Sequence, residues 1–339
     1  MILQMLRDAD DYVSGQQIGD RLGVSRTAAW KLVGKLKEEG YPIEAVTKKG
    51  YRLLSVDDKD IFNEKEIANQ MRTVWAGHPL LFKEVTGSTN ADAFQASEEG
   101  FPHGTLVVTS QQTAGRGRRG REWISPPDEN IYMSILLRPA LRPEAAPMLT
   151  LVQALAVCEA AQEICGNRVQ FAIKWPNDLV ARVGGGAYRK CCGILTEMRL
   201  EENEIRDVVI GIGINVNQTE FPDTIRETAT SIALAMAEDG AAFRRINRAA
   251  LTAGIWEKFE IYYDRFEKAQ SLAPLREAYE ARLVNTGRAV RVLDPAGPFD
   301  GVAAGITDYG DLVVRPADGS PDRHVSSGEV SVRGVNGYV

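Results

Sequence analysis

The chain has 339 residues, of which 44% are hydrophobic and 25% are charged, as in ordinary globular proteins. This length predicts two or three domains, and the formal net charge of −6 argues against a protein coated in nucleic acid. No uninterrupted apolar run reaches the roughly 18 residues that cross a membrane, and the N-terminus is too short and too acidic for a signal peptide. We therefore expect a cytoplasmic protein with no membrane partner.

The cysteines and histidines predict neither a metal site nor a catalytic triad. Four cysteines are compatible with a reducing compartment. Cys191 and Cys192 are adjacent, so on a strand they would point to opposite faces and make a poor metal pair. We expect all four thiols to be buried, and the three scattered histidines to be ordinary.

The N-terminal part predicts a helix-turn-helix. Residues 16–22 form a short amphipathic helix pattern, a glycine turn follows, and Ser25 is a good N-cap for a second helix over 26–39. Two short helices joined by such a turn are typical of this motif. Residues 43–46 and 51–54 predict two strands around a basic turn, which adds a wing.

This module is basic within an acidic chain, with eight Lys/Arg and four Asp/Glu between Gln16 and Leu53. We predict a winged helix DNA-binding domain over residues 1–56, followed by a polar linker over 55–60. Bases would be contacted by Arg26, Thr27, Trp30 and Lys31, and phosphates by Lys35, Lys48, Lys49 and Arg52. Two alternatives remain open: winged helices also bind proteins, and Trp30 could be a core residue.

A second domain begins near Ile61. Residues 80–85 predict a strand that ends at Gly87-Ser88-Thr89-Asn90, and a helix over 91–99 follows. A further strand over 105–110 leads into residues 115–121, which hold four arginines and three glycines. Glycines let backbone N–H groups approach a ligand, and arginines supply forked donors for carboxylates and phosphates. This segment predicts a loop that closes over an anion, although a merely solvated basic loop is the alternative.

The spacing Gly115-x-Gly117-x-x-Gly120 also matches the dinucleotide-binding fingerprint, which requires a helix directly after the glycines. Pro126 and Pro127 instead exclude a helix start here, and residues 130–137 predict another strand. A strand–loop–strand unit therefore excludes the Rossmann interpretation.

The rest of the second domain predicts one long helix and several strands. Residues 145–165 are rich in Ala and Leu and predict a helix packed across a sheet, and residues 184–186 predict a loose glycine hairpin tip. Residues 208–216 predict a strand with Gly211, Gly213 and Asn215 on one face, which would form a wall for a flat ligand. From Gly287 onward, short strands and turns predict a small β-barrel.

Several motifs together resemble those of biotin–protein ligases. Gln112-x-Ala114-Gly115-Arg116-Gly117-Arg118-x-Gly120-Arg121-x-Trp123 is similar to that family's biotin-binding loop. Further matches follow in the family's order: Gly87-Ser88-Thr89-Asn90, Lys174-Trp175-Pro176-Asn177-Asp178, Lys190-Cys191-Cys192-Gly193-Ile194-Leu195 and Gly211-Ile212-Gly213-Ile214-Asn215. The resemblance extends from about Gly15 to the C-terminus.

The resemblance implies an α+β protein with three domains. These are the winged helix over 1–56, a mixed-sheet α/β catalytic domain over 61–285, similar to that of class II synthetase-like biotin ligases, and an SH3-like β-barrel over 286–339. It further implies biotin and ATP as substrates, Mg²⁺ on the phosphates, and activation of biotin to biotinyl-5′-AMP. Biotin would then pass to a lysine of a biotin carboxyl carrier protein, as in a biotin–[acetyl-CoA-carboxylase] ligase. Operator DNA and a homodimer of the adenylate-bound protein are the other implied partners.

The resemblance also implies roles for individual residues. Biotin would contact Ser88, Thr89, Asn90, Gln112, Arg116, Gly117, Arg118, Lys190, Gly193 and Gly213. ATP would contact Arg121, Trp123, Lys174, Asn177, Asp178 and Asn215, with Asp178 near the metal. Arg118, Lys174 and Lys190 would be catalytic. Two alternatives remain: a lipoate ligase on a similar scaffold, and a repressor that senses biotin without catalysis.

Overall fold

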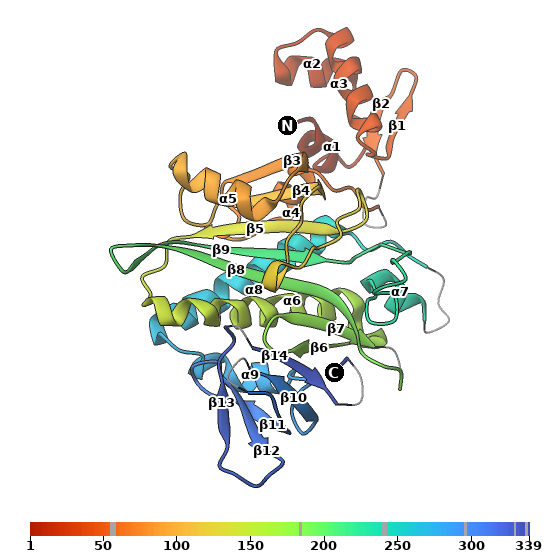
Figure 1. Cartoon of the computed structure of the whole chain (residues 1–339). Coiled ribbons are helices and arrows are strands. Elements are labelled where there is room, and N and C mark those ends of the chain that lie inside the picture. The colour runs from red at the N-terminus through yellow and green to blue at the C-terminus, as the bar shows by residue number, and fades with distance from the viewer. Residues whose placement is uncertain (55–58, 183–184, 239–242, 295–296, 329, 336–337) are drawn as a thin grey trace. The chain divides into compact units, whose positions relative to one another are not determined.

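A computed structural model describes the chain except for residues 55–58, 183–184, 239–242, 295–296, 329 and 336–337. It divides into two compact units, residues 1–62 and 63–339, each of which is described by itself (Figure 1). Most of the predicted linker and Gly184 of the predicted hairpin tip lie outside the described residues.

The first unit contains the predicted helix-turn-helix and strand pair. Its elements are α1 (Ile2–Arg7), α2 (Gly15–Leu22), α3 (Arg26–Glu38), β1 (Ile43–Val46) and β2 (Gly50–Leu53), and the two strands are antiparallel. Ser25 caps α3 as predicted, because its hydroxyl accepts a 3.2 Å hydrogen bond from the Ala28 N–H. Helix α1 was not predicted, and it completes the core by burying Ile2, Leu3 and Leu6.

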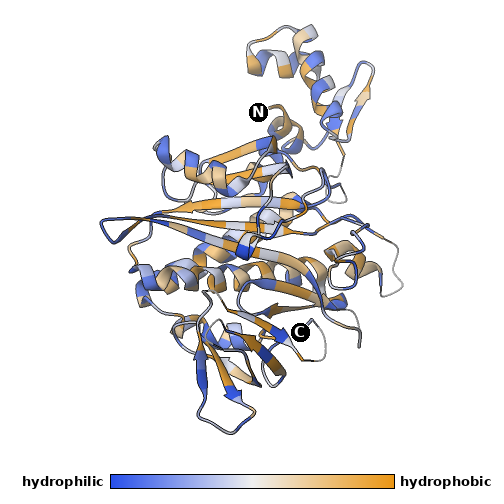
Figure 2. Cartoon of the chain, viewed as in Figure 1, coloured by the Kyte–Doolittle hydropathy of each residue, from blue (hydrophilic) through white to orange (hydrophobic). Residues whose placement is uncertain are grey.

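A seven-stranded mixed sheet forms the centre of the second unit. Its strand order is β3-β4-β5-β9-β8-β7-β6, with β3 and β4 parallel and all other neighbours antiparallel. The strands are β3 (Leu80–Thr86), β4 (Leu106–Gln112), β5 (Ile131–Leu137), β6 (Gln170–Lys174), β7 (Asp178–Arg182), β8 (Arg189–Glu201) and β9 (Glu204–Ile214). The central strand β5 is mostly apolar and is buried along its whole length (Figure 2). The predicted strand–loop–strand around the Gly/Arg segment is present as β4, loop and β5.

The two faces of this sheet have different coverings. On one face, Thr196 of β8 accepts a 2.8 Å hydrogen bond from Thr150 of α6 (Leu149–Cys165), and α8 (Arg248–Ala269) packs on α6. Side chains alternate along a strand, so Leu195 and its cross-strand partner Gly211 point to the opposite face. That opposite face carries α5 (Thr89–Glu98) over β4, β5 and β9.

Helix α6 is the core helix of the second unit. Its predicted first turn is instead a 3₁₀ helix, η2 (Pro143–Met148), because Pro147 cannot donate a helical hydrogen bond. By length and composition alone the helical segment Pro143–Arg168 is apolar enough to span a membrane, although the sequence has no uninterrupted apolar run of that length. In the fold, 78% of its most apolar window is buried, so the segment serves as a core element.

The remaining elements complete the second unit. They are α4 (Glu64–Gln70), α7 (Ile232–Ala237), α9 (Arg276–Glu280), and short 3₁₀ turns at Arg118–Gly120, Gly166–Arg168 and Ala273–Leu275. The C-terminal strands β10 (Ala289–Leu293), β11 (Phe299–Ile306), β12 (Leu312–Pro316), β13 (Arg323–Val325) and β14 (Ser331–Gly334) form one antiparallel sheet in the order β13-β12-β11-β10-β14. The four cysteines are free and buried, as predicted.

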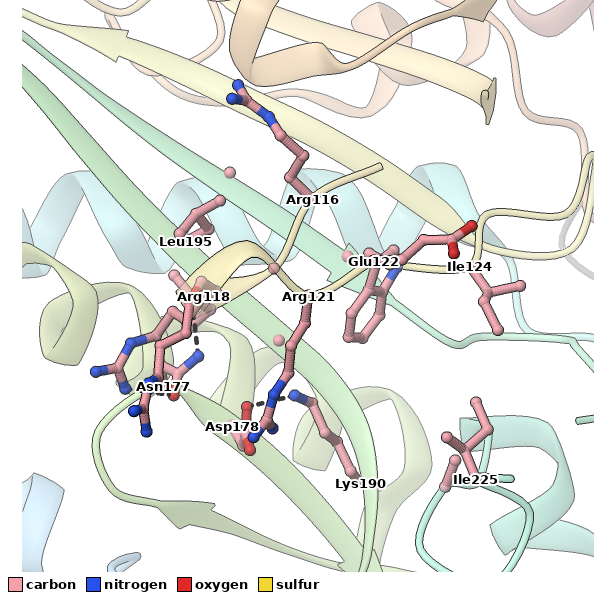
Figure 3. A pocket seen from close by; sticks show the side chains of 18 of the residues that line it. Arg116, Arg118, Arg121, Glu122, Ile124, Asn177, Asp178, Lys190, Leu195 and Ile225 are labelled. Atoms are coloured by element: carbon pink, nitrogen blue, oxygen red, sulfur yellow. Dashed lines mark hydrogen bonds and ion pairs between the residues drawn. The ribbon is translucent and has the colours of Figure 1, made fainter. Parts of the chain in front are cut away.

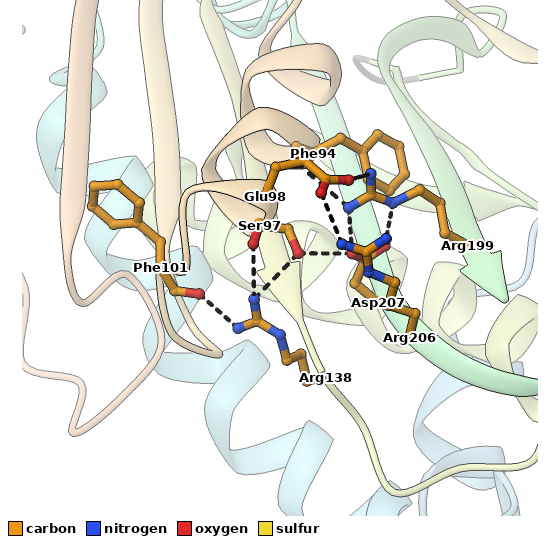
Figure 4. A network of polar contacts seen from close by, with 8 residues as sticks. All are labelled: Phe94, Ser97, Glu98, Phe101, Arg138, Arg199, Arg206 and Asp207. Carbon is orange, nitrogen blue, oxygen red and sulfur yellow. Dashed lines mark hydrogen bonds and ion pairs between the residues drawn. The ribbon is translucent and has the colours of Figure 1, made fainter. Parts of the chain in front are cut away.

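A polar network fixes α5 against the sheet (Figure 4). Arg199 of β8 donates to buried Asp207 of β9 at 2.9 Å, and Ser97 of α5 donates to the same carboxylate at 2.7 Å. Glu98 accepts hydrogen bonds from Arg199 and Arg206. Because α5 begins at the Ser88–Asn90 motif, this network sets the position of that motif.

We expect Asp207→Asn to destabilise the fold by about 1–3 kcal/mol at neutral pH, because a charged hydrogen-bond acceptor is lost in a buried position. Burial alone would raise the pKa of Asp207, but hydrogen bonds from Arg199 and Ser97 outweigh it and lower that pKa. The stabilisation is thus present above the unfolded-state pKa of about 3.9 and is lost as pH falls through the lower folded-state value. Urea denaturation of both proteins as a function of pH measures this difference.

Asp300→Asn is the matched control, because Asp300 pairs with Arg291 at an exposed position of the C-terminal sheet. It should change the free energy of unfolding little. An Asp207→Asn deficit that stays constant down to pH values below the folded-state pKa would contradict the assignment.

Candidate active site

A cavity of about 820 Å³ opens on the α5 face of the central sheet. Its walls come from the sheet, from the Gly/Arg loop, from residues 218–229 and from β14 of the C-terminal sheet. Every residue predicted to bind biotin or ATP lines this cavity: Ser88, Thr89, Asn90, Gln112, Arg116, Gly117, Arg118, Arg121, Trp123, Lys174, Asn177, Asp178, Lys190, Gly193, Gly213 and Asn215. The volume suits a ligand of nucleotide size.

The Gly/Arg loop is folded as a small hairpin over the cavity (Figure 3). The Gly117 N–H donates to the Arg121 carbonyl at 2.7 Å, and the Trp123 N–H donates to the Gly115 carbonyl at 2.9 Å. Arg119 at the tip has a φ of 60°, a left-handed conformation that costs energy for an arginine. The loop therefore has defined geometry as well as charge.

The predicted glycine wall is present, and the flat group that lies against it is the indole of Trp123. A Cβ added to Gly213 would lie 2.4 Å from the Trp123 Nε1 atom, and one added to Gly193 would lie 2.8 Å from the same ring. Any larger residue at either position would displace the indole. The buried Nε1–H of Trp123 has no hydrogen-bond partner within the described part of the chain.

One end of the cavity presents neutral polar groups. Gln112 accepts from the Thr89 N–H at 3.0 Å and so caps the first turn of α5, while its Nε2 donates to Ser125 at 3.1 Å. Ser88 lies at the N-cap position. These hydroxyls and amides suit a neutral ring that both donates and accepts hydrogen bonds.

Three of the predicted amide side chains are already engaged within the protein. Asn90 donates to Glu197 at 2.6 Å and accepts from Ser134 at 2.6 Å. Asn177 donates to the Ile194 carbonyl at 3.0 Å, and Asn215 donates to the Thr230 carbonyl at 3.2 Å. In this structure these amides form hydrogen bonds within the walls of the cavity. A sequence motif does not distinguish an amide that holds a wall from one that contacts a ligand.

The opposite end of the cavity is cationic and contains one buried carboxylate. The Lys190 ammonium lies 2.6 Å from Asp178. Burial alone would raise the pKa of Asp178, but the charge and hydrogen bond of Lys190 outweigh it and hold that pKa below its usual range. Burial lowers the pKa of Lys174 to about 8, although Asp178 opposes this shift.

The Arg118 side chain already forms hydrogen bonds within the protein, which its sequence motif does not indicate. Its guanidinium donates to the Asn177 Oδ1 at 3.1 Å and to the Gly328 carbonyl at 2.7 Å, which joins the loop to the C-terminal sheet. Burial lowers its pKa, although Asp178 opposes the shift. Figure 3 places Arg118 beside Asn177, and Arg121 beside the Asp178–Lys190 pair.

Sequence reasoning missed the contribution of the C-terminal segment to this cavity. Tyr338 donates to Asp178 at 2.7 Å, and the Lys174 ammonium lies 3.6 Å from the centre of its ring. Arg333 of β14 also lines the cavity. These residues lie more than 150 positions from Lys174 and Asp178 and outside every recognised motif, so no local pattern indicates them.

The predicted DNA-contacting side chains are mostly exposed in the first unit. Trp30 is 62% exposed, which excludes the core alternative. Exposed as well are Arg26, Thr27, Lys31, Lys35, Lys48 and Lys49. Arg52 differs, because its guanidinium forms a 3.0 Å ion pair with Glu44 and lies over the ring of Tyr12. A phosphate contact by Arg52 would therefore compete with this pair.

Comparisons with known proteins agree with this geometry. Residues 82–215 match the model of the biotin/lipoate A/B protein ligase family, residues 1–52 match a helix-turn-helix domain, and residues 286–333 match the biotin protein ligase C-terminal domain. The chain is 40% identical to the bifunctional ligase/repressor BirA of Bacillus subtilis, with 91% of each chain covered. The chain belongs to the biotin protein ligase family.

Other relatives support the same assignment. A biotin–[acetyl-CoA-carboxylase] ligase of Paracoccus denitrificans is 33% identical, with 68% of this chain and 91% of that protein covered. The structure of a biotin protein ligase from Aquifex aeolicus in complex with biotin and ATP is similar, with a TM-score of 0.61 and 28% identity over 75% of this chain and 98% of that chain.

The low pKa of Lys174 predicts a pH-dependent affinity of this ligase for phosphate chains. Lys174 is charged below pH 8 and becomes neutral as the pH rises through that value, so the affinity for inorganic tripolyphosphate should fall between about pH 7 and 9. Lys174→Arg keeps its charge and should bind equally well at both pH values. Isothermal titration calorimetry at the two pH values measures this, and a flat wild-type profile would show that Lys174 does not supply the charge.

Proposed function

We propose that this chain activates biotin with ATP to biotinyl-5′-AMP, transfers biotin to a lysine of a biotin carboxyl carrier protein, and represses transcription through its N-terminal domain. The observation that supports this proposal most strongly is one cavity that has a neutral polar end and a cationic end and is enclosed by the Gly/Arg loop. Membership of the biotin protein ligase family supports the substrates, and the helix-turn-helix supports the repressor role.

The cationic end addresses the main electrostatic barrier of the reaction. Biotin's carboxylate must approach the α-phosphate of ATP although both are anions, and two such charges about 4 Å apart repel by roughly 4 kcal/mol at an effective dielectric near 20. Lys174, Lys190 and Arg121 line the cavity where this repulsion would arise. Their positive charges offset it and stabilise the negative charge that develops at the phosphorus.

We assign the two substrates to the two ends of the cavity. Biotin's ureido ring would lie at the neutral end, against Ser88, Thr89, Gln112 and the backbone at Gly117, with its carboxylate directed toward Lys190 and Arg118. The adenine ring would lie near Trp123, whose indole offers a flat face, and the phosphates near Arg121 and Lys174. The loop then shields the adenylate from water until the acceptor lysine arrives.

The site also fits the Mg²⁺ that the family implies. Mg²⁺ is commonly held by one or two carboxylates together with phosphate oxygens and water. Asp178 is ionised and lies among the cations of the phosphate end, whereas the described residues include no cluster of three or more acidic, His or Cys side chains that would hold a metal alone. Asp178 would therefore hold the ion jointly with the nucleotide, where the ion would neutralise phosphate charge.

The proposal extends to the domain boundaries and to the oligomeric state. The DNA-binding domain would span residues 1–56 as a winged helix, with β1 and β2 as the wing, followed by the catalytic domain over 61–285 and an SH3-like domain over 286–339. We also propose that the adenylate-bound protein dimerises and acts in the cytoplasm. One helix-turn-helix for each subunit supports a dimer, since two copies read the two halves of a symmetric operator.

Incubation of the protein with biotin, labelled ATP and a biotin-acceptor domain tests the enzymatic part. We expect biotin on the acceptor lysine and release of pyrophosphate. A repressor without catalysis would bind biotin and release none, and a lipoate ligase would give product with lipoate in place of biotin.

Lys190→Ala should slow adenylate formation by about 10²–10³-fold, by analogy with the loss of other groups that stabilise developing charge. It should also lower stability, because Asp178 would remain as a buried carboxylate without its 2.6 Å partner. Asp178→Asn in addition should restore much of the stability and none of the activity. Rapid-quench kinetics and thermal melting separate the two effects, and normal adenylate formation by Lys190→Ala would contradict the role of Lys190.

Lys48→Ala combined with Lys49→Ala should weaken binding to every DNA sequence and reduce the slope of log affinity against log salt by up to about two. Both lysines are exposed on the β1–β2 turn, where they can reach phosphates. Arg26→Ala should instead relax base preference, by about 1–3 kcal/mol if it contacts guanine. A gel-shift salt series with biotin and ATP present measures both effects, and a wild-type slope in the double variant would exclude a phosphate contact by the wing.

A further inference from the structure

Glu197 is a polar residue close to the cavity that none of the recognised motifs contains. It lies on β8, on the face that carries α5, but it does not line the cavity. Its carboxylate accepts a 2.6 Å hydrogen bond from the Asn90 amide and lies 3.6 Å from the guanidinium of Arg116. Glu197 therefore contacts both the start of α5 and the Gly/Arg loop.

The contact to Asn90 belongs to a continuous chain of buried polar groups. The Asn90 Oδ1 accepts from the Ser134 hydroxyl at 2.6 Å, and the Ser134 and Thr89 hydroxyls lie 2.7 Å apart. Ser134 is fully buried and Asn90 is 4% exposed. Because Glu197 accepts from the Asn90 NH₂ group, it fixes which way the amide faces and so orients the hydroxyls at the neutral end of the cavity.

The Asn90 side chain is packed closely against the sheet, so its hydrogen bonds depend on where the strands beneath it lie. A Cβ added to Gly211, the cross-strand partner of Leu195, would lie 1.9 Å from the Asn90 Oδ1 atom. The Asn90 side chain thus lies directly on the sheet, where β8 supplies its anionic partner. A shift of β8 would move the amide and the hydroxyls together.

The contact between Glu197 and Arg116 explains why the Arg116 side chain extends in a different direction from those of Arg118 and Arg121. Figure 3 shows the Arg116 side chain pointing away from Arg118 and Arg121, which extend toward Asn177 and Asp178. Arg116 pairs with Glu197 at the other end of the cavity. Its neighbour Gly117 begins the hydrogen-bonded turn of the loop.

We propose that Glu197 is a positioning residue that ties the Gly/Arg loop to the neutral end of the cavity and thereby sets the affinity for biotin. This inference rests on the proposed function, which places biotin's ureido ring at that end. Glu197 acts through Asn90 and Arg116 and touches no substrate itself. Loss of its charge leaves the loop less firmly held before biotin binds, and the cost of ordering the loop then falls on the binding step.

Glu197→Gln separates the loop contact from a role in the fold. The glutamine carbonyl can still accept from Asn90, but the neutral amide does not hold the Arg116 charge. Glu201→Gln is the matched control, because Glu201 lies on the same strand and is exposed. Circular dichroism and thermal melting of both variants should match wild type.

Limited trypsin digestion of the unliganded protein measures how accessible the Gly/Arg loop is, because trypsin cleaves after Arg118, Arg119 and Arg121. An ion pair at this exposure changes an equilibrium by about two- to fivefold, so Glu197→Gln should be cleaved in the loop about two- to fivefold faster than wild type or Glu201→Gln. At high salt the three proteins should be cleaved alike, because the charge pair is screened. Equal cleavage at low salt, or faster cleavage spread along the chain with a lowered melting temperature, would overturn the proposal.

Steady-state kinetics supplies the second readout. Glu197→Gln should raise the KM for biotin by a similar factor, while kcat and the KM for ATP stay at the control values. An unchanged KM for biotin, or a fall in kcat alone, would overturn the assignment. If even the wild-type protein forms no adenylate, the proposed ligase function fails, whereas the trypsin result still decides whether Glu197 holds the loop.

Discussion

The cavity depends on one buried carboxylate among several cations. Lys190 pairs with Asp178 at 2.6 Å, and Lys174 and Arg121 lie around the same cavity. Burial, together with the neighbouring cations Lys190, Arg333 and Arg121, lowers the pKa of Lys174 to about 8. Asp178 offsets part of this shift in the ligand-free protein. A polyanionic nucleotide would offset the remainder, so the charge arrangement itself favours a phosphate ligand.

The residues around this group of charges are small or held by hydrogen bonds. Glycines at positions 193 and 213 bring the Trp123 indole against the sheet, and Gln112 caps α5 from the neighbouring strand. The strands beneath are covered on their far side by α6, against which α8 packs. A rigid sheet with a glycine face is thus able to carry a loop that must hold and release an intermediate.

Sequence reasoning predicted most elements and every motif that lines the cavity, because these signals are local. Ser25 as a helix cap, the glycine face of β9 and the strand–loop–strand around the Gly/Arg segment all follow from neighbouring residues. Helix α1 was missed because six residues carry too little periodicity. The contacts of Tyr338 and Glu197 join segments that lie far apart in the sequence, so no local pattern predicts them. A motif also does not show that the Asn90 amide, which lines the cavity, donates to Glu197.

Exchange of labelled pyrophosphate into ATP requires the anionic biotin carboxylate to attack ATP reversibly in this cavity. We expect exchange that depends on biotin, that is absent with the uncharged alcohol of biotin, and that falls about 10²–10³-fold in Lys190→Ala. Exchange that proceeds without biotin, or that is undiminished when Lys190 is removed, would show that the cationic end does not drive this attack.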